Sequence, residues 1–154
     1  VPTQPELAMG AIASGGAVAL NDDVIRAVAV DPGALDAVIR AETGELARRE
    51  ALYRGPRPRP ALTGANVVVV DDGLATGATM RAGVLAVRAG GAAWVLAAAP
   101  VGSAQAVRAV REVADEVVCA TVPRHFDAVG LWYDEFAAVS DDEMAELLAA
   151  HRDE

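Results

Sequence analysis

Five residues near the middle of the chain have types and spacing that could bind a sugar phosphate. Asp71 and Asp72 are adjacent carboxylates, and Thr76, Gly77 and Thr79 follow them closely. A glycine lets the backbone wrap around an anion, and threonine hydroxyl groups can donate hydrogen bonds to it. The carboxylates would repel a phosphate, so their natural partners are sugar hydroxyl groups or a divalent cation. The arrangement therefore predicts a site for a ribose 5-phosphate.

The elements on either side of these residues should position them. Residues 67–70 are four consecutive valines, which predict a strand of a parallel sheet that is covered on both faces. A helix is predicted after the loop, with Met80, Val84 and Val87 on one face and the glycines at 90–91 as its stop. The N-terminus of that helix would offer unpaired N–H groups and a positive dipole end to a phosphate.

Residues 67–79, here called the motif segment, resemble the thirteen-residue signature of type I phosphoribosyltransferases. In that signature, hydrophobic residues lead into an acidic pair and then a T-G-x-T loop. The resemblance implies that Asp71 and Asp72 are catalytic and bind the 2′- and 3′-hydroxyl groups of phosphoribosyl pyrophosphate (PRPP). It also implies that the 5′-phosphate binds to the phosphate loop, which consists of Ala75, Thr76, Gly77, Ala78 and Thr79.

Two positions qualify the resemblance. Gly73 stands where the family usually has an aliphatic residue, and Ala75 stands where enzymes acting on hypoxanthine and guanine carry an acidic residue. Adenine phosphoribosyltransferases also have alanine there, so Ala75 disfavours one class of acceptor without removing the activity. Residues 5–16 and 129–133 are similar to an uncharacterised bacterial branch of the family, and this resemblance covers nearly all of the chain.

The resemblance implies an enzyme of nucleotide metabolism. It would transfer a phosphoribosyl group from PRPP to a nitrogen acceptor such as a nucleobase and release pyrophosphate. Mg²⁺ would bind to pyrophosphate and ribose oxygens, with no metal ligand assigned directly to the chain, and the protein would form a homodimer. The alternative is a non-catalytic regulatory or fused partner domain that binds PRPP.

Composition narrows the classes of partner. The chain has 154 residues and a net charge of −9 with no lysine, so a nucleic-acid backbone would be repelled. The sequence offers no apolar run of the ~18 residues that span a bilayer and no signal at its start, so we expect a cytoplasmic protein that does not bind membranes. Cys119 is the single cysteine, and it reads as a small core residue.

The rest of the chain alternates between strand-like and helical patterns, which predicts an α/β fold. We expect a central, mostly parallel sheet flanked by helices, with a small C-terminal hood region. The expected elements are two short β-like runs within residues 10–20, a helix over 31–53, strands over 93–99 and 116–121, a helix over 103–114 and a final helix capped at Ser140. The carboxyl ends of the parallel strands should form the ligand site.

The sequence says least about which residues would contact pyrophosphate. The family's pyrophosphate loop would precede Val1, so we expect residues 1–154 to form a single phosphoribosyltransferase-like domain without its native N-terminal strand and that loop. Arg54, Arg57 and Arg59 are separated by glycine and proline in an extended loop. One of these arginines could contact pyrophosphate, although solvated surface is the ordinary role of such a loop.

Aromatic residues after the third predicted strand lie where the family builds its hood over the acceptor. Phe126, Trp132 and Tyr133 could stack on a planar base, although filling a core or a dimer contact is their commoner role. His125 and His151 have no partner at metal-site or triad spacing. We therefore expect a rim position for His125 and a helix-end role for His151.

Overall fold

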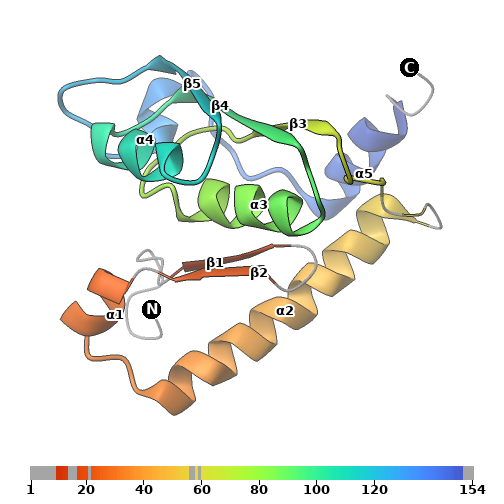
Figure 1. Cartoon of the computed structure of the whole chain (residues 1–154), viewed down its shortest axis with the longest axis horizontal. Helices are drawn as coiled ribbons and strands as arrows, with labels where there is room; N and C mark the ends of the chain where they lie inside the picture. Colours follow the sequence, from red (N-terminus) through yellow and green to blue (C-terminus); the bar gives the residue numbers. More distant parts are fainter. Residues whose placement is uncertain (1–9, 14–16, 21, 56–57, 59, 151–154) are drawn as a thin grey trace.

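The computed structural model describes residues 10–13, 17–20, 22–55, 58 and 60–150. The chain alternates strands and helices from β3 onward, as the sequence predicts (Figure 1). In chain order the elements are β1 (Gly10–Ala13), β2 (Ala17–Leu20), α1 (Asp22–Ala27), α2 (Pro32–Arg54), β3 (Asn66–Val70), α3 (Ala78–Ala89), β4 (Trp94–Val101), α4 (Ala104–Arg111), β5 (Glu116–Thr121), the 3-10 helix η1 (Val129–Trp132) and α5 (Asp141–Ala150).

The long helix α2 begins and ends where its sequence signals predict. Asp31 Oδ2 accepts a hydrogen bond from the Ala34 N–H at 3.0 Å, and Pro32 occupies the first helical position, where a missing N–H costs nothing. Gly55 ends the helix with a φ of 62°. Although α2 has 23 residues, neither it nor any other helix in the described part of the chain is long and apolar enough to cross a membrane.

Three parallel strands form the central sheet in the order β3-β4-β5. Val67 pairs with Val95, and Ala98 pairs with both Val70 and Val118. Each strand is joined to the next by a helix, and α3 and α4 lie on the same side of the sheet (Figure 1). A parallel sheet flanked by helices confirms the predicted fold class.

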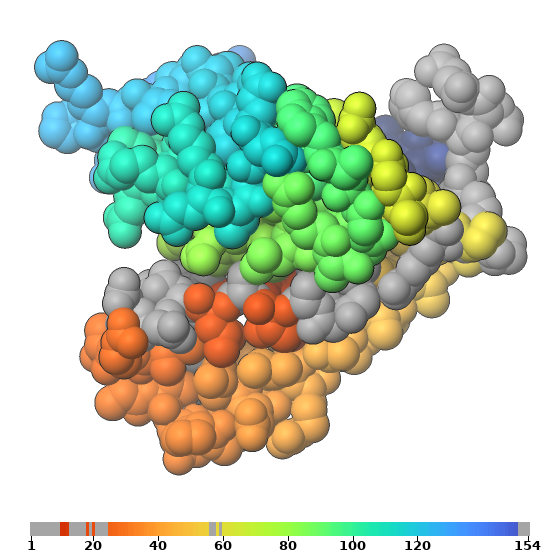
Figure 2. Space-filling view, in the orientation of Figure 1, coloured from red at the N-terminus to blue at the C-terminus, as the bar shows by residue number. Residues whose placement is uncertain are grey.

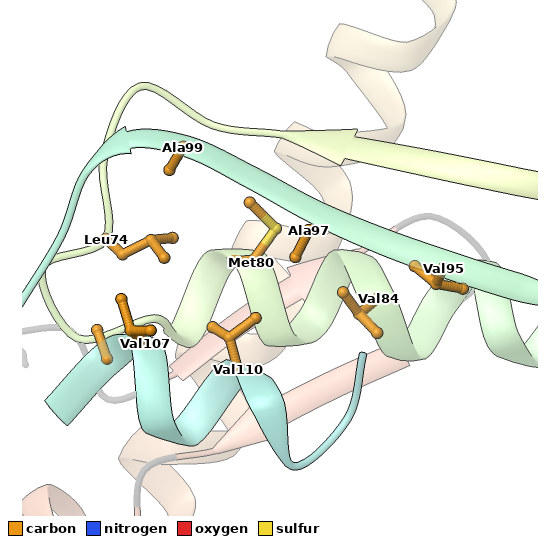
Figure 3. Close-up of a cluster of buried hydrophobic side chains, with 9 residues drawn as sticks. Leu74, Met80, Val84, Val95, Ala97, Ala99, Val107 and Val110 are labelled. Atoms are coloured by element: carbon orange, nitrogen blue, oxygen red, sulfur yellow. The ribbon is translucent and has the colours of Figure 1, made fainter. Parts of the chain in front are cut away.

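The core lies between this sheet and its two crossover helices (Figure 3). The helices contribute Met80, Val84, Val107 and Val110, and β4 contributes Val95, Ala97 and Ala99. Met80 and Val84 lie on the face of α3 that the helical spacing predicts, and both are buried. Burial of a valine side chain contributes about 1.5–3 kcal/mol. This core therefore holds β3 and α3 in fixed positions on either side of residues 71–77.

The four-valine strand corrects one prediction. Coverage on both faces was expected, but Val68 is 56% exposed and Val70 is 72% exposed. Successive side chains of a strand point to opposite faces, and α3 and α4 cover the same face of the sheet. Val69 therefore packs against the core, whereas the exposed Val68 and Val70 belong to the opposite face of the sheet. With Val118, which is 48% exposed, they form an open sheet face.

A second layer lies against the other side of α3. The antiparallel hairpin of β1 and β2 contacts α3, and α2 contacts β1. Figure 2 shows the red atoms of the hairpin between the orange and yellow atoms of α2 and the green atoms of the layer above. Helix α3 is thus covered by the sheet on one side and by the hairpin on the other.

The C-terminal helix α5 contacts α2, and the carboxylate of Asp141 bonds to two side chains of α2. Asp141 accepts hydrogen bonds from Arg48 Nη2 at 2.6 Å and from the Tyr53 hydroxyl at 2.5 Å. At the start of α5, Ser140 Oγ accepts the Glu143 N–H at 3.2 Å, which confirms the predicted cap. Helix α2 precedes the parallel sheet in the chain and α5 follows it, so this contact joins two segments that are far apart in sequence.

Helix α4 is shorter than its predicted span of 103–114. The N–H groups of Val113 and Ala114 both donate to the Val110 carbonyl, at 3.1 and 3.0 Å, so the chain turns tightly after Arg111. Asp115 then accepts the Val95 N–H at 2.6 Å and pairs with Arg88 at 2.7 Å. These contacts lead the chain directly into β5.

Candidate functional site

The acidic pair lies at the carboxyl end of β3. The Asp71 N–H donates to the Ala98 carbonyl at 3.1 Å, so Asp71 still follows the path of the strand. The Asp72 N–H donates to Asp71 Oδ1 at 3.0 Å. Asp71 is partly buried, whereas Asp72 is exposed. The two neighbouring carboxylates therefore have different surroundings.

The environment of Asp71 disfavours its ionised form. Burial raises the pKa of the Asp71 carboxyl above its ordinary value of 3.8, and the nearby charge of Asp72 raises this pKa further. The hydrogen bond from the Asp72 N–H acts in the opposite direction. A hydroxyl donor or a cation close to this carboxylate would stabilise its charge. The pair is therefore suited to a ligand rich in hydroxyl groups.

Leu74 anchors the chain directly after the pair. Its side chain is 1% exposed and belongs to the core in Figure 3. The Leu74 N–H donates to the Val101 carbonyl, and the Leu74 carbonyl accepts the Ser103 N–H, both at 2.9 Å. A Cβ on Gly102 would lie 2.9 Å from Leu74 Cβ, so this close approach requires glycine. The phosphate loop thus leaves the sheet from a fixed point.

Ser103 holds the next residue of the loop. Its hydroxyl donates to the Ala75 carbonyl at 2.9 Å and accepts the Ala106 N–H at 3.0 Å. The same side chain therefore caps α4 and fixes the start of the phosphate loop. Nothing in the spacing of the sequence indicated this double role.

The phosphate loop turns sharply into α3. Gly77 has a left-handed φ of 76°, and a Cβ there would lie 3.1 Å from Val110 Cγ2, so both conformation and space favour glycine. Thr76 and Thr79 are exposed, and Thr76 Oγ1 accepts the Ala78 N–H at 3.3 Å. Within the described residues, the backbone N–H groups of Thr76, Gly77 and Thr79 have no hydrogen-bond acceptor. These donors are available to an anion at the N-terminus of α3.

The three aromatic residues predicted for the hood differ from one another in their contacts and in their exposure. The Tyr133 hydroxyl donates to the Asp72 carbonyl at 2.6 Å, a contact with the acidic pair that the sequence did not reveal. Trp132 is 46% exposed, and Phe126 is partly buried. The departure of Gly73 from the family pattern was the available signal, because the side chain of Val129, in the same segment as Tyr133, packs directly on that glycine.

The predicted pyrophosphate contacts are only partly visible. Arg54 is the last residue of α2 and already interacts with another group. Arg57, Arg59 and His151 lie outside the described residues. His125 is exposed, as expected for a rim residue.

The described residues give little support to a cysteine nucleophile or to a metal site formed by the chain alone. Cys119 packs against the core and donates its S–H to the Thr121 carbonyl at 3.3 Å, which confirms the predicted core role. Burial raises the pKa of the Cys119 thiol, and a raised pKa disfavours the thiolate that a nucleophile needs. In the described part of the chain, no group of three or more His, Cys, Asp or Glu residues could hold a metal ion.

Comparisons with known proteins agree with this geometry. The family model described as "Phosphoribosyl transferase domain" matches residues 10–134. Two Mycobacterium tuberculosis proteins are each 49% identical over 154 residues: "Putative phosphoribosyl transferase MT0597" of strain CDC 1551 / Oshkosh and "Putative phosphoribosyl transferase Rv0571c" of strain ATCC 25618 / H37Rv. The crystal structure of TT1426 from Thermus thermophilus is similar, with a TM-score of 0.72 and 38% identity.

The lengths of these relatives differ from that of the chain. The matches to the two mycobacterial proteins cover 99% of this chain but 35% of each relative, so the chain spans about a third of their length. The match to TT1426 covers 97% of this chain and 70% of that protein.

Proposed function

The chain belongs to the phosphoribosyl transferase domain family, and from this premise we propose that it transfers the phosphoribosyl group of PRPP to a nitrogen acceptor such as a nucleobase, releasing pyrophosphate. One observation carries the proposal. A pair of carboxylates at a strand end and a loop of N–H donors that have no acceptor among the described residues belong to one strand-loop-helix unit, from β3 to α3. Carboxylates accept hydrogen bonds from sugar hydroxyl groups, and N–H donors at a helix N-terminus bind phosphate.

In this proposal the two ends of the unit hold the two ends of ribose 5-phosphate. Asp71 and Asp72 accept hydrogen bonds from the 2′- and 3′-hydroxyl groups. Residues 75–79 bind the 5′-phosphate through backbone N–H groups and the hydroxyl groups of Thr76 and Thr79. The raised pKa of Asp71 supports the assignment, because ligand hydroxyl groups would satisfy a carboxylate that burial leaves poorly solvated.

The carboxylates would also act on the reaction itself. As the bond from C1 to pyrophosphate breaks, positive charge develops on the sugar ring, and Asp71 and Asp72 can stabilise it. Holding the ribose at both ends keeps C1 in line with the acceptor nitrogen. The principal contribution of this chain is therefore orientation and electrostatic stabilisation.

A Mg²⁺ ion fits this site together with PRPP, because Mg²⁺ is usually bound through one or two carboxylates and the phosphates of a substrate. The acidic pair supplies two carboxylates, and among the described residues no group of three or more His, Cys, Asp or Glu residues could hold a metal ion. The ion would take its remaining oxygens from the ligand, with Asp71 and Asp72 close to it. When bound, it supplies neutralisation of the pyrophosphate leaving group. We also propose, on the family resemblance, a cytoplasmic homodimer.

Isothermal titration calorimetry with PRPP and Mg²⁺ tests the binding step. We expect binding in the micromolar to millimolar range and strong weakening in the double variant Asp71→Asn and Asp72→Asn. Inorganic phosphate serves as the control ligand, because its binding to the phosphate loop should survive loss of the two carboxylates. Absence of PRPP binding at millimolar concentration by a folded sample would overturn the proposal.

A non-catalytic PRPP-binding domain is the second candidate. The observation that favours it is length, since the chain matches about a third of each mycobacterial relative and could serve a larger protein as a binding module. Pyrophosphate release separates the two candidates. A chain that binds PRPP and forms pyrophosphate with a panel of nucleobases is a transferase, whereas binding without turnover favours the module.

A further inference from the structure

Gly73 and Val129 form a close contact across the chain. A Cβ built on Gly73 would lie 2.6 and 2.7 Å from the two γ-carbons of Val129. Such distances are shorter than van der Waals contact, so any side chain at position 73 would displace Val129. The valine therefore fills the space that a side chain at position 73 would occupy. This contact accounts for glycine where the family usually has an aliphatic residue.

Tyr133 holds the neighbouring residue from the same side of the chain. Its hydroxyl donates to the Asp72 carbonyl at 2.6 Å, across 61 residues of sequence. Apart from this bond, Asp72 makes one recorded hydrogen bond among the described residues, from its N–H to Asp71 Oδ1. The exposed Asp72 lies between Asp71 and Leu74, whose N–H groups donate to carbonyls of β4. The hydroxyl of Tyr133 adds a constraint at Asp72 itself.

Residues 129–136, here called the hood segment, have their own internal contacts. Val129–Trp132 forms the 3-10 helix η1, and the Tyr133 N–H donates to the Gly130 carbonyl at 3.4 Å. The rings of Tyr133 and Phe136 have centroids 5.2 Å apart, and Phe136 packs on Gly130 so closely that a Cβ there would lie 2.8 Å from Cδ1. These contacts link Val129 and Tyr133 within one short segment.

We propose that the hood segment positions the second carboxylate of the acidic pair for the ribose, with Tyr133 and Val129 as positioning residues. Tyr133 fixes the carbonyl of Asp72, and Val129 fixes the backbone at Gly73. Together they set the direction in which the Asp72 carboxylate leaves the strand end. This inference rests on the proposed function and assigns residues beyond the motif segment to recognition of the sugar.

The first test replaces Tyr133 by phenylalanine. The Tyr133→Phe variant keeps the ring that packs on Phe136 and loses only the hydrogen bond to Asp72. We expect the affinity for PRPP with Mg²⁺ to fall about two- to tenfold, the range for one hydrogen bond. The affinity for inorganic phosphate should not change, because the phosphate loop is held by Leu74 and Ser103.

Tyr53→Phe is a matched control for this experiment. Tyr53 is the other tyrosine of the chain, and its hydroxyl also donates to an oxygen of an aspartate, Asp141, at the contact between α2 and α5. The variant undergoes the same chemical change away from the site. Its PRPP affinity should equal that of the unchanged chain.

A second test uses the contact between Gly73 and Val129. Gly73→Ala forces its new Cβ against Val129, so it should weaken PRPP binding. Val129→Ala removes both γ-carbons from that space, and the double variant should therefore bind PRPP more tightly than Gly73→Ala alone. Such a rescue requires coupling between the two positions. Equal losses in Gly73→Ala and in the double variant would contradict the inference.

The outcomes distinguish this inference from the proposed function. If the unchanged chain fails to bind PRPP, the proposed function is wrong and this inference fails with it. If the unchanged chain binds PRPP and Tyr133→Phe binds it equally well, only the inference on the hood segment is overturned. If Tyr133→Phe loses PRPP and phosphate affinity to the same degree, Tyr133 has a general structural role and the inference is also overturned.

Discussion

At the scale of single residues, the partial burial of Asp71 disfavours the negative charge of its carboxylate. Its folded-state pKa is raised above 3.8, so folding favours the neutral carboxyl. This contribution to stability is complete below the unfolded pKa and is lost as the pH rises through the folded pKa. At neutral pH the protein therefore carries a carboxylate that slightly destabilises it in the absence of ligand. Such a cost is common where a residue is placed for binding.

Asp71→Asn should therefore change stability in a pH-dependent way. We expect a small rise in melting temperature at pH 7, because the charge is removed, and no rise below pH 3.8, where the carboxyl of the unfolded chain is itself neutral. Differential scanning calorimetry between pH 3 and 7 measures the effect. A large fall in melting temperature at pH 7 would show that Asp71 is a structural residue.

Asp115→Asn is the control of opposite sign. Pairing with Arg88 lowers the pKa of Asp115 below 3.8, so its contribution to stability is present above 3.8 and lost as the pH falls through the folded pKa. This variant should lower the melting temperature at pH 7, and the difference should shrink in acid.

At the scale of elements, two serine caps allow a clean comparison. Ser103→Ala and Ser140→Ala each remove an N-cap, so each should cost about 1 kcal/mol of unfolding free energy. Only Ser103→Ala also releases the Ala75 carbonyl. We therefore expect weaker phosphate binding by calorimetry in Ser103→Ala alone. Equal phosphate affinity in the two variants would show that the hydroxyl of Ser103 does not order the loop.

The two faces of β3 provide another matched pair. Val69 packs against the core, whereas Val70 is 72% exposed, and threonine keeps the β-branched shape at both positions. Val69→Thr should cost about 1–3 kcal/mol, because it buries a hydroxyl group without a prepared partner. Val70→Thr should stay within about 0.5 kcal/mol. Urea denaturation measures both, and equal losses would mean that the open sheet face is covered in solution.

These elements also show how far the sequence could predict the structure. Periodicity and caps predicted β3, α3, α2 and the start of α5, because each signal lies within a few neighbouring residues. The prediction that both faces of the strand at residues 67–70 are covered was wrong, because four valines indicate a strand but do not show which of its faces are covered. The contacts made by Tyr133 and Val129 have no periodic signal, since they join residues far apart in the chain.

At the scale of the whole molecule, Asp141 connects the last helix to the rest. It accepts hydrogen bonds from Arg48 and Tyr53, and these bonds lower its pKa, with Tyr53 contributing most. No residue of α5 is fully buried, and Asp141 makes these polar bonds between this helix and α2.

Asp141→Asn should loosen α5 without unfolding the sheet. We expect faster amide hydrogen exchange across residues 141–150 and a nearly unchanged melting temperature, because the core between β4, α3 and α4 is untouched. Asp142→Asn is the matched control, since it removes a carboxylate from the same helical turn. Equal acceleration of exchange in both variants would mean that helix charge, not the contact with α2, governs α5.

The contact between Arg48 and Asp141 also bears on the order of folding. These residues are 93 positions apart, and the whole parallel sheet lies between them in sequence. Each strand of that sheet is joined to its neighbour by a single helix, so its contacts close short loops, whereas the contact between α2 and α5 closes a long one. We expect the sheet with α3 and α4 to form first and α5 to dock last. Detachment of α5 from α2 would then be an early step of unfolding, which leaves the strand-loop-helix unit of the site intact.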